Sequence, residues 1–179
     1  LGDEEEYDGD QSNETSHLDE STLEESEFVD NIVLPADVTR QLKLAAQRDS
    51  VWIVRECLES SAASVNSEDD LGFTAMHFAA QNGSLRAMRV LFEFNADIAI
   101  TNANDCSPLL LAVAAWQIDA VKLLLERLEL ECKQEPSQAQ ARRMHVLNQR
   151  DKDGMSALTC ACAYGQEQIV RYLLNAGAH

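Results

Sequence analysis

The sequence has few aromatic residues, few basic residues and no long apolar run. Aromatic residues make up 6% of the 179 positions, which is little for the core of a β-sandwich or barrel. Lys and Arg total 14 against 31 Asp and Glu, for a net charge of −17. Such an acidic chain is a poor candidate for general binding to nucleic acid or anionic membranes, because both need basic surface. The longest wholly apolar run, 109–116, is too short to span a bilayer, so no membrane insertion is expected.

The chain also lacks a secretory signal and an even set of cysteines. It begins at Leu1 rather than Met, without a basic stretch followed by an apolar one, so we expect it to be cut from a longer protein. Five cysteines do not suit a disulfide framework. A reducing compartment, cytoplasmic or nuclear, is therefore predicted.

The acidic charge is concentrated at the N-terminus. Residues 1–30 contain 13 acidic side chains and no Lys or Arg. Apolar side chains are sparse there until Phe28, so the segment cannot bury enough surface to offset its ordering entropy. We interpret residues 1–35 as an acidic segment that is either disordered or a docking peptide; both readings stay open.

A period of 33 residues organises the rest of the chain. Two segments correspond at an offset of 33. The first is Gly72-Phe73-Thr74-Ala75-Met76-His77-Phe78-Ala79-Ala80, and the second is Asp105-Cys106-Ser107-Pro108-Leu109-Leu110-Leu111-Ala112-Val113. A third copy begins at Gly154, with 16 extra residues before it, and a weaker copy precedes all three. In the second half of each copy, apolar residues recur at i, i+3, i+6 and i+7, which predicts a helix with one buried stripe. Such a unit cannot bury its stripe alone, so neighbouring units must stack.

The segment 69–83 contains Asp69, Gly72-x-Thr74, His77-x-Ala79-Ala80 and Gly83. In these residues it resembles the ankyrin repeat family, as does the closing Ala176-Gly177-Ala178. The resemblance implies an all-α, ankyrin-type α-solenoid of about four stacked helix-turn-helix repeats with short finger loops, preceded by the acidic segment. The repeats cover residues 36–179. They divide at about 36–68, 69–101, 102–150 and 151–179, and the third contains the 16-residue insertion.

Individual residues predict local structure within the units. Thr74, Ser107 and Ser156 stand where a hydroxyl can cap a helix, and Pro108 suits the first helical turn. Gly83 and Gly165 are placed to end the first helix in a left-handed conformation.

Two positions of the repeat pattern need comment, one that departs from it and one that matches it. Trp116 occupies the position of Gly83 and Gly165, so a reshaped turn with a partly exposed indole is expected there. That indole either packs on a neighbouring turn or anchors a partner. His77 holds the family's histidine position, which implies that its ring ties neighbouring loops together; Leu110 and Thr159 replace it in the next two units.

The insertion carries the one basic stretch of the protein. We expect the second helix of the third unit to run on to about Cys132, and a short extra helix over 138–146. Residues 133–152 have a net charge of +3, either as a solvated loop or as a site for the acidic segment in cis. The residues predicted for this in-cis docking are Lys133, Arg142, Arg143 and Arg150.

No catalytic, cofactor or metal motif stands out. The sequence has no phosphate-cradling glycine loop with Lys, no His-Glu-x-x-His and no Gly-x-Ser-x-Gly. Cys160 and Cys162 align with Phe78 and Ala80, so we assign both to the packed inner helix rather than to a metal. The acids Asp69, Asp70, Asp151 and Asp153 are expected at finger tips, exposed and unpaired.

Two functions remain open. The first is a non-catalytic scaffold or adaptor that binds a protein or peptide, of basic character if the finger-tip acids contribute. The resemblance places that site on the finger tips and the concave face of the first helices: Asp70, Leu71, Phe73, Gln81, Asn82, Ala103, Asn104, Cys106, Ala114, Ala115, Trp116, Lys152, Asp153, Met155, Ala163 and Tyr164. The second is a regulatory ankyrin segment of a larger enzyme, kinase or channel, with the acidic segment as an in-cis lid. The apolar residues Ile169, Val170, Leu173 and Leu174 of the final unit need cover, which favours further repeats or another domain beyond His179.

Overall fold

The computed structural model describes residues 38–60, 63–134 and 136–179, and it consists there of helices joined by turns and loops. The acidic segment 1–35 lies outside them. The helices are α2 (Val38–Gln47), α3 (Val51–Glu59), α4 (Ala75–Asn82), α5 (Leu85–Glu93), α6 (Pro108–Ala114), α7 (Ile118–Gln134), α8 (Pro136–Leu147), α9 (Ala157–Ala163) and α10 (Glu167–Asn175). The one β feature among them is an isolated bridge between Arg150 and Ser156. The predicted all-α class is confirmed.

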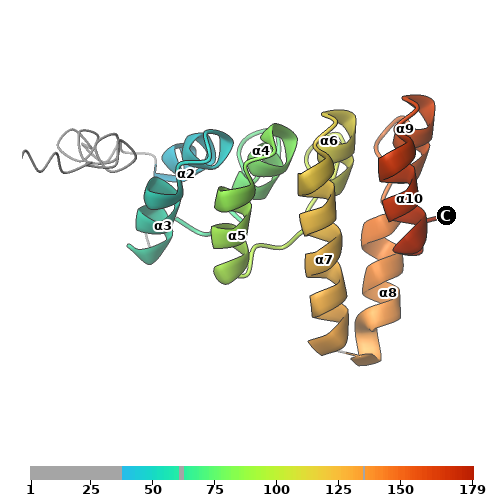
Figure 1. Cartoon of the computed structure of the whole chain (residues 1–179). Helices are drawn as coiled ribbons and strands as arrows, with labels where there is room; N and C mark the ends of the chain where they lie inside the picture. The colour runs from blue at the N-terminus through green and yellow to red at the C-terminus, as the bar shows by residue number, and fades with distance from the viewer. Residues whose placement is uncertain (1–37, 61–62, 135) are drawn as a thin grey trace, which may run out of the picture. The chain divides into compact units, whose positions relative to one another are not determined.

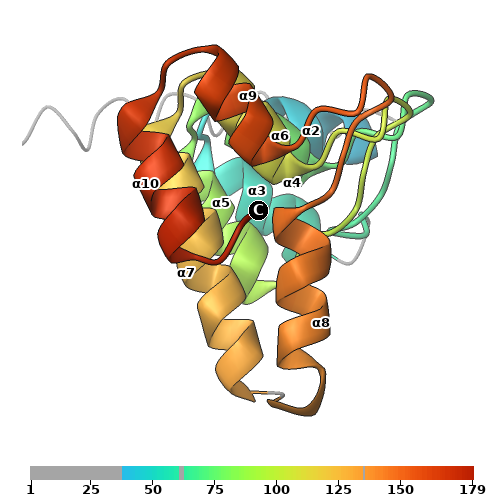
Figure 2. The same cartoon turned by 90° about the vertical axis from the view of Figure 1, so that its right-hand side faces the viewer.

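The helices form two layers of a solenoid. The first helices of the units, α2, α4, α6 and α9, lie side by side as an inner layer, and α3, α5, α7 and α10 form the outer layer (Figure 1). Seen along the stack, the loops between units project together to one side of the helices (Figure 2). This is the four-unit ankyrin-type arrangement that the sequence predicts. In the described part of the chain, no helix is long and apolar enough to cross a bilayer.

Small residues inside and an apolar stripe outside hold the layers together. Ala46, Ala80 and Ala112 are fully buried, so neighbouring inner helices approach closely. Met88 and Leu173 of the outer helices are fully buried beneath them. Removing such apolar surface from water supplies the main stabilisation, at about 25 cal/mol per Å².

Hydroxyl residues begin the inner helices, as predicted. The Ser107 Oγ accepts the Leu110 N–H at 3.3 Å, and the Ser156 Oγ accepts the Thr159 N–H at 3.2 Å. Pro108 opens α6, where its missing N–H would have had no helical partner. Gly83 ends α4 with φ 69°, and Gly165 follows α9 with φ 67°, which confirms the left-handed turns predicted at both.

One side chain shapes each finger loop from within. The Oδ1 of Asp69 accepts the N–H groups of Leu71 and Phe73, at 3.0 and 2.8 Å. Asn102 and Asp151 make the same pair of bonds in the next two fingers. Asp69 also lies 3.9 Å from the ammonium of buried Lys43. The expectation that Asp69 and Asp151 are unpaired is therefore wrong, because both organise their loops.

Hydrogen bonds join each finger to the next. The Ala103 N–H donates to the Leu71 carbonyl at 2.8 Å, and the Lys152 N–H donates to the Asn104 carbonyl at 3.1 Å. The His77 Nδ1 accepts the Thr74 N–H at 3.0 Å, which leaves its proton on Nε2, 3.1 Å from the Cys106 carbonyl oxygen. His77 thus braces two fingers, as the resemblance implies.

The insertion forms a helical hairpin rather than a loose loop. α7 runs on to Gln134 and α8 returns beside it, so the extra helix is confirmed and longer than predicted. The Arg142 guanidinium donates to Glu131 at 2.8 Å and to Asp97 at 3.0 Å. The Gln149 Nε2 donates to the Ala99 carbonyl at 2.7 Å. These bonds anchor the hairpin of the third unit to the end of the second.

The buried His77 predicts an acid-sensitive stability. Burial lowers the pKa of His77 from 6.5 to about 4, against smaller opposing effects of the Cys106 carbonyl and Asp69. The unfolded chain therefore binds a proton more readily, so this group destabilises the fold as the pH falls through 6.5 toward 4. Between pH 7.5 and pH 5 the loss is about 2 kcal/mol of unfolding free energy.

The substitution His77→Leu, which copies Leu110 of the next unit, is expected to remove this dependence and to lower stability at pH 7.5. Urea unfolding at both pH values measures it. If the wild type and the variant lose the same free energy of unfolding between the two pH values, His77 is not the cause of the acid sensitivity.

Candidate functional site

The residues predicted for partner binding lie on the finger loops and at the ends of the inner helices. Most of them are exposed: Asp70, Leu71, Gln81, Asn82, Ala103, Asn104, Ala114, Trp116, Lys152, Asp153, Ala163 and Tyr164. They recur from unit to unit, because each comes from the same position of a stacked repeat. We call this set the ridge surface.

The other predicted residues are half-buried and support the ridge surface instead of covering it. They are Phe73, Cys106, Ala115 and Met155. The Phe73 ring packs against Phe78 with centroids 5.3 Å apart, and its edge meets the His77 ring at 5.7 Å. Phe73 and Met155 therefore offer only part of their side chains to a partner. A signal was present in the sequence, since both precede the hydroxyl that begins an inner helix.

Large apolar side chains stand out on the ridge surface. Leu71, Trp116 and Tyr164 are 63%, 56% and 57% exposed. Trp116 and Tyr164 lie in adjacent turns, since Gln166 Nε2 donates to the Val113 carbonyl at 2.9 Å. Exposed aromatic residues on a rigid framework supply contact area at low conformational entropy.

Trp116 adopts the conformation that its two glycine equivalents adopt. Its φ is 60°, close to those of Gly83 and Gly165. The expectation of a reshaped turn is thus wrong, whereas the partial exposure of the indole is confirmed. A left-handed conformation costs a residue with a Cβ roughly 1–3 kcal/mol, and such strain is concentrated at functional sites.

The finger tips carry acidic side chains. Asp70, Asp105 and Asp153 are exposed, and Lys152 is the one basic residue at these three tips. Asp105 has φ 60° and takes the turn position that Gly72 and Gly154 occupy in the neighbouring fingers. The tips therefore present a mainly negative surface, which favours encounter with a positively charged partner.

The basic insertion residues differ in availability. Arg142 is engaged by Glu131 and Asp97, and the Arg150 guanidinium donates to the Gly154 carbonyl at 2.8 Å. Lys133 is exposed and Arg143 half-buried, and neither forms an ion pair with another residue in the described ranges. Lys133 and Arg143 thus differ from Arg142 and Arg150, whose guanidinium groups already have partners.

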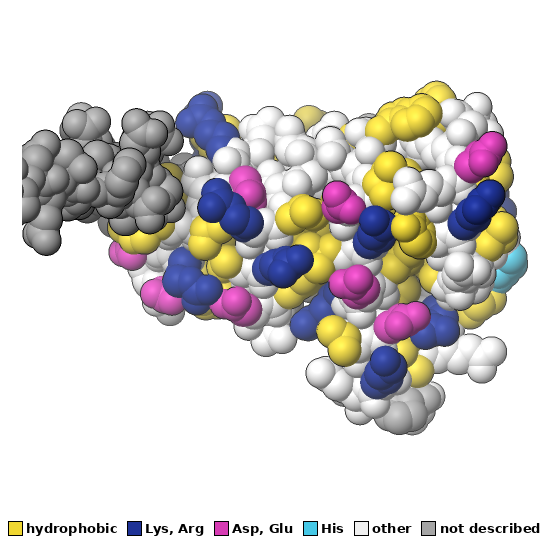
Figure 3. All heavy atoms as spheres, viewed as in Figure 1, with side chains coloured by type: hydrophobic (Ala, Val, Ile, Leu, Met, Phe, Trp, Pro, Cys, Tyr) yellow, Lys and Arg dark blue, Asp and Glu magenta, His cyan; other side chains and the backbone are white. Residues whose placement is uncertain are grey.

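The outer helices form a different face, built from ion pairs that the sequence analysis missed. Basic and acidic side chains alternate across it (Figure 3). Arg55 of α3 donates to Glu93 of α5 at 2.6 Å, and the Arg127 guanidinium lies 5.4 Å from the centre of the Phe92 ring. Partners in different repeats leave no short-range signal in the sequence. The ion pairs on this face join residues of neighbouring units and so help to hold these units together.

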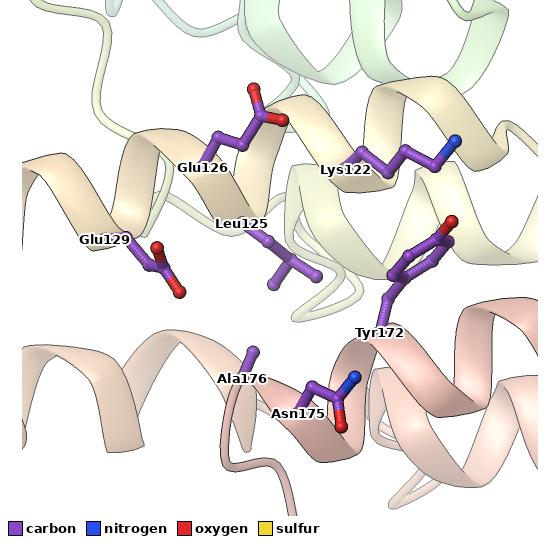
Figure 4. Close-up of a pocket in the computed structure, with 7 residues that line it drawn as sticks. All are labelled: Lys122, Leu125, Glu126, Glu129, Tyr172, Asn175 and Ala176. Carbon is purple, nitrogen blue, oxygen red and sulfur yellow. The ribbon is translucent and has the colours of Figure 1, made fainter.

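A small groove of about 280 Å³ separates α7 from α10. It is lined by Lys122, Leu125, Glu126, Glu129, Tyr172, Asn175 and Ala176. Leu125 and Ala176 face each other across it, and the Lys122 ammonium lies 5.2 Å from the Tyr172 ring centre (Figure 4). Its lining holds no Cys, Ser, Thr or His, and its size suits one side chain rather than a substrate.

Among the described residues, the cysteines and His77 are placed and protonated in ways that do not favour catalysis. Burial is the main cause that raises the pKa of the Cys57, Cys106 and Cys160 thiols, which keeps them protonated and weakly nucleophilic. His77 is fully buried between two fingers. Within the described ranges, no group of three or more His, Cys, Asp or Glu could hold a metal ion.

Comparison with known families supports the same architecture. A family profile described as "Ankyrin repeats (3 copies)" matches residues 42–136, and one described as "Ankyrin repeat" matches 153–179. The chain belongs to the ankyrin repeat family. Ankyrin repeats imply protein–protein interaction, and such domains are generally non-catalytic.

Several known proteins share this region. The chain is 29% identical over 85 residues to the putative ankyrin repeat protein FPV244 of fowlpox virus (strain NVSL), covering 48% of this chain and 13% of that protein. It is 24% identical over 138 residues to the human transient receptor potential cation channel subfamily A member 1, covering 76% of this chain and 11% of the channel. The Caenorhabditis elegans homolog of that channel is 27% identical over 141 residues, covering 79% of this chain and 10% of the homolog. The chain thus spans only a small part of the length of these relatives.

The strained turn at Trp116 yields a stability prediction. Trp116→Gly is expected to raise the free energy of unfolding by about 1 kcal/mol, since relief of the left-handed backbone exceeds the entropy that glycine adds to the unfolded chain. Urea unfolding measures the change.

The matched control is Gly165→Ala, because a Cβ at Gly165 meets no atom within 4 Å and tests the backbone cost alone. It is expected to lower stability by about 1 kcal/mol. If Trp116→Gly proves less stable than the wild type, the indole packs well enough to outweigh the strain.

Proposed function

We propose that this chain is a non-catalytic protein-interaction module, a scaffold or adaptor, that binds a partner polypeptide across the ridge surface. The observation that carries this proposal is Trp116, an exposed indole held at positive φ where two neighbouring units have glycine. A residue whose backbone conformation costs stability and whose large side chain is exposed to solvent is best explained by a role in binding. Tyr164 adds a second exposed aromatic ring in the turn after α9, and Leu71 adds an exposed apolar side chain on a finger.

The rigidity of the fingers supports the proposal. Each loop is fixed by an Asp or Asn side chain from within and by backbone hydrogen bonds to its neighbour. A preorganised surface loses little entropy when it binds, so a modest number of contacts suffices for affinity. The acidic tips favour a partner that carries basic residues near its apolar anchor.

A two-site substitution tests the module. Trp116→Gly with Tyr164→Ser is expected to weaken retention of specific partners by at least about tenfold, because aromatic anchors dominate such interfaces. Pulldown from cell extract with the 36–179 fragment, quantified by mass spectrometry, measures retention.

The control is Arg171→Glu on the exposed side of α10, whose side chain is 79% exposed. Partners retained equally by the double variant and by this control do not bind the ridge surface. The same pulldown with the acidic segment attached shows whether residues 1–35 change the set of partners.

The second candidate is a regulatory segment of a larger enzyme, kinase or channel. The observation that favours it is the match over most of this chain to a member of a cation channel subfamily and to its homolog. In this reading the acidic segment 1–35 acts as an in-cis lid on the basic hairpin, through Lys133 and Arg143.

Hydrogen exchange tests the lid. Deleting residues 1–35 is expected to speed amide exchange over 133–152 in low salt and to have a smaller effect in high salt, because screening weakens exposed ion pairs. The doubly substituted chain Lys133→Gln and Arg143→Gln is expected to exchange alike with and without the segment. Equal exchange of the unsubstituted hairpin in both chains means that no lid forms.

A further inference from the structure

The groove between α7 and α10 has an apolar floor. Leu125 of α7 and Ala176, which follows the last residue of α10, form this floor, and both are 9% exposed. They face each other across a space of about 280 Å³ (Figure 4). Because the groove lies between two outer helices, it is separate from the finger tips and the inner helices that carry the ridge surface.

The preceding junction of the outer layer shows which kind of side chain covers such a floor. Leu125 corresponds to Phe92 of α5 at an offset of 33, and Ala176 corresponds to Arg127 of α7 at an offset of 49. The Arg127 guanidinium lies 5.4 Å from the centre of the Phe92 ring, so a long cationic side chain covers the floor between α5 and α7. The alanine at the equivalent position is too short to cover Leu125. The groove therefore lies where an arginine side chain lies one junction earlier.

Two carboxylates flank the groove. Glu126 and Glu129 of α7 are exposed, and neither forms an ion pair with another residue in the described ranges. Glu126 is the equivalent of Glu93, whereas Glu129 stands where the second unit has Ala96, so the third unit adds a negative charge here. The last turn of α10 carries no basic residue and adds the partial negative charge of a helix C-terminus. The groove thus attracts a cation.

The lysine in the lining leaves one end of the groove for that cation. Lys122 and Glu129 lie at opposite ends of the groove (Figure 4). The Lys122 ammonium donates to Asp119 at 3.1 Å and lies 5.2 Å from the Tyr172 ring centre. An incoming cation is therefore favoured at the Glu129 end, away from the repulsion of this ammonium.

We propose that this groove binds an arginine side chain of a partner polypeptide. The guanidinium binds Glu129, and Glu126 adds a second negative charge beside it. The aliphatic part of the arginine covers Leu125 and Ala176. Arginine suits the groove better than lysine, because a guanidinium is more weakly hydrated than an ammonium and can bind a carboxylate through two N–H groups. Arg127 over the equivalent floor is the internal precedent for this choice.

A capped amino acid tests the groove without a known partner. N-acetyl-arginine methylamide is titrated into the isotope-labelled chain, and the backbone amide shifts are followed by NMR. Saturable shifts in the millimolar range are expected at Leu125, Glu129 and Ala176. The lysine analogue is expected to bind at least about twofold more weakly. The citrulline analogue, which has nearly the same shape but no charge, is expected to leave these amides unshifted.

Two variants locate the binding site. The pair Glu126→Gln and Glu129→Gln keeps the size of both side chains and is expected to weaken binding at least about threefold, as for exposed ion pairs. Ala176→Arg copies Arg127 of the preceding unit, so it is expected to fill the groove and to abolish the shifts. In both variants the amides of the first two units are expected to keep their positions, which shows that the fold survives.

The matched control is the pair Glu56→Gln and Glu167→Gln. It removes the same charge from exposed positions of α3 and α10 that do not line the groove. Binding of the arginine probe at the groove is expected to stay unchanged. Because shifts are measured residue by residue, weak attraction of the probe to the acidic segment 1–35 is distinguished from binding at the groove.

Three results overturn the proposal. The first is an arginine probe that shifts no amide of the groove, or a citrulline analogue that shifts the same amides equally. The second is a control pair that weakens binding as much as Glu126→Gln with Glu129→Gln, because long-range charge then explains the effect. The third is a chain that dimerises in sedimentation with the groove amides shifted in step, because the occupant is then a second copy. Partner loss by the Trp116 and Tyr164 variants bears on none of these results.

Discussion

The structure depends on one constraint: no helix pair in it can bury its apolar stripe alone. Met88 and Leu91 of α5 face inward, yet they are completely buried only because a second unit lies against the first. Stability therefore arises at the junctions between units, and each junction depends on small residues such as Ala80 and Ala112 that let the inner helices approach. The main helix contacts lie within one unit or between adjacent units, so each unit depends directly on its neighbours.

That constraint also shapes the surface available to partners. Since the helices are committed to their neighbours, what remains free is the set of positions that stacking does not use: loop tips, helix ends and the outer face. On the outer face, charges such as Arg55 and Glu93 neutralise one another across units. At the loop tips and helix ends, Trp116, Tyr164 and Asp70 are exposed to solvent. These side chains are therefore available for contact with a partner.

Period, caps and buried stripes were predictable from the sequence because each is a local or strictly repeated signal. Ser107, Pro108 and the left-handed glycines act within one turn of helix, and a fixed offset of 33 carries them from unit to unit. Trp116 was predicted to distort its turn, because propensity alone cannot show that the surrounding structure forces a costly φ. Arg142 was predicted as a docking residue for the acidic segment. Its ion pairs with Glu131 and Asp97 could not be predicted, because these partners lie on other elements and one of them belongs to another unit. Cys162 was assigned to the packed inner layer but is exposed, because the repeat pattern assumes a neighbour on both sides.

The hairpin of α7 and α8 changes how the array comes apart. In a simple stack every junction can open independently, so the units peel away one after another under a pulling force. Here Arg142 reaches back to Asp97, and Gln149 to Ala99, so the third unit grips the second outside their shared helical junction. Pulling the third unit away from the second therefore has to break these two polar contacts as well as the apolar packing of the helices.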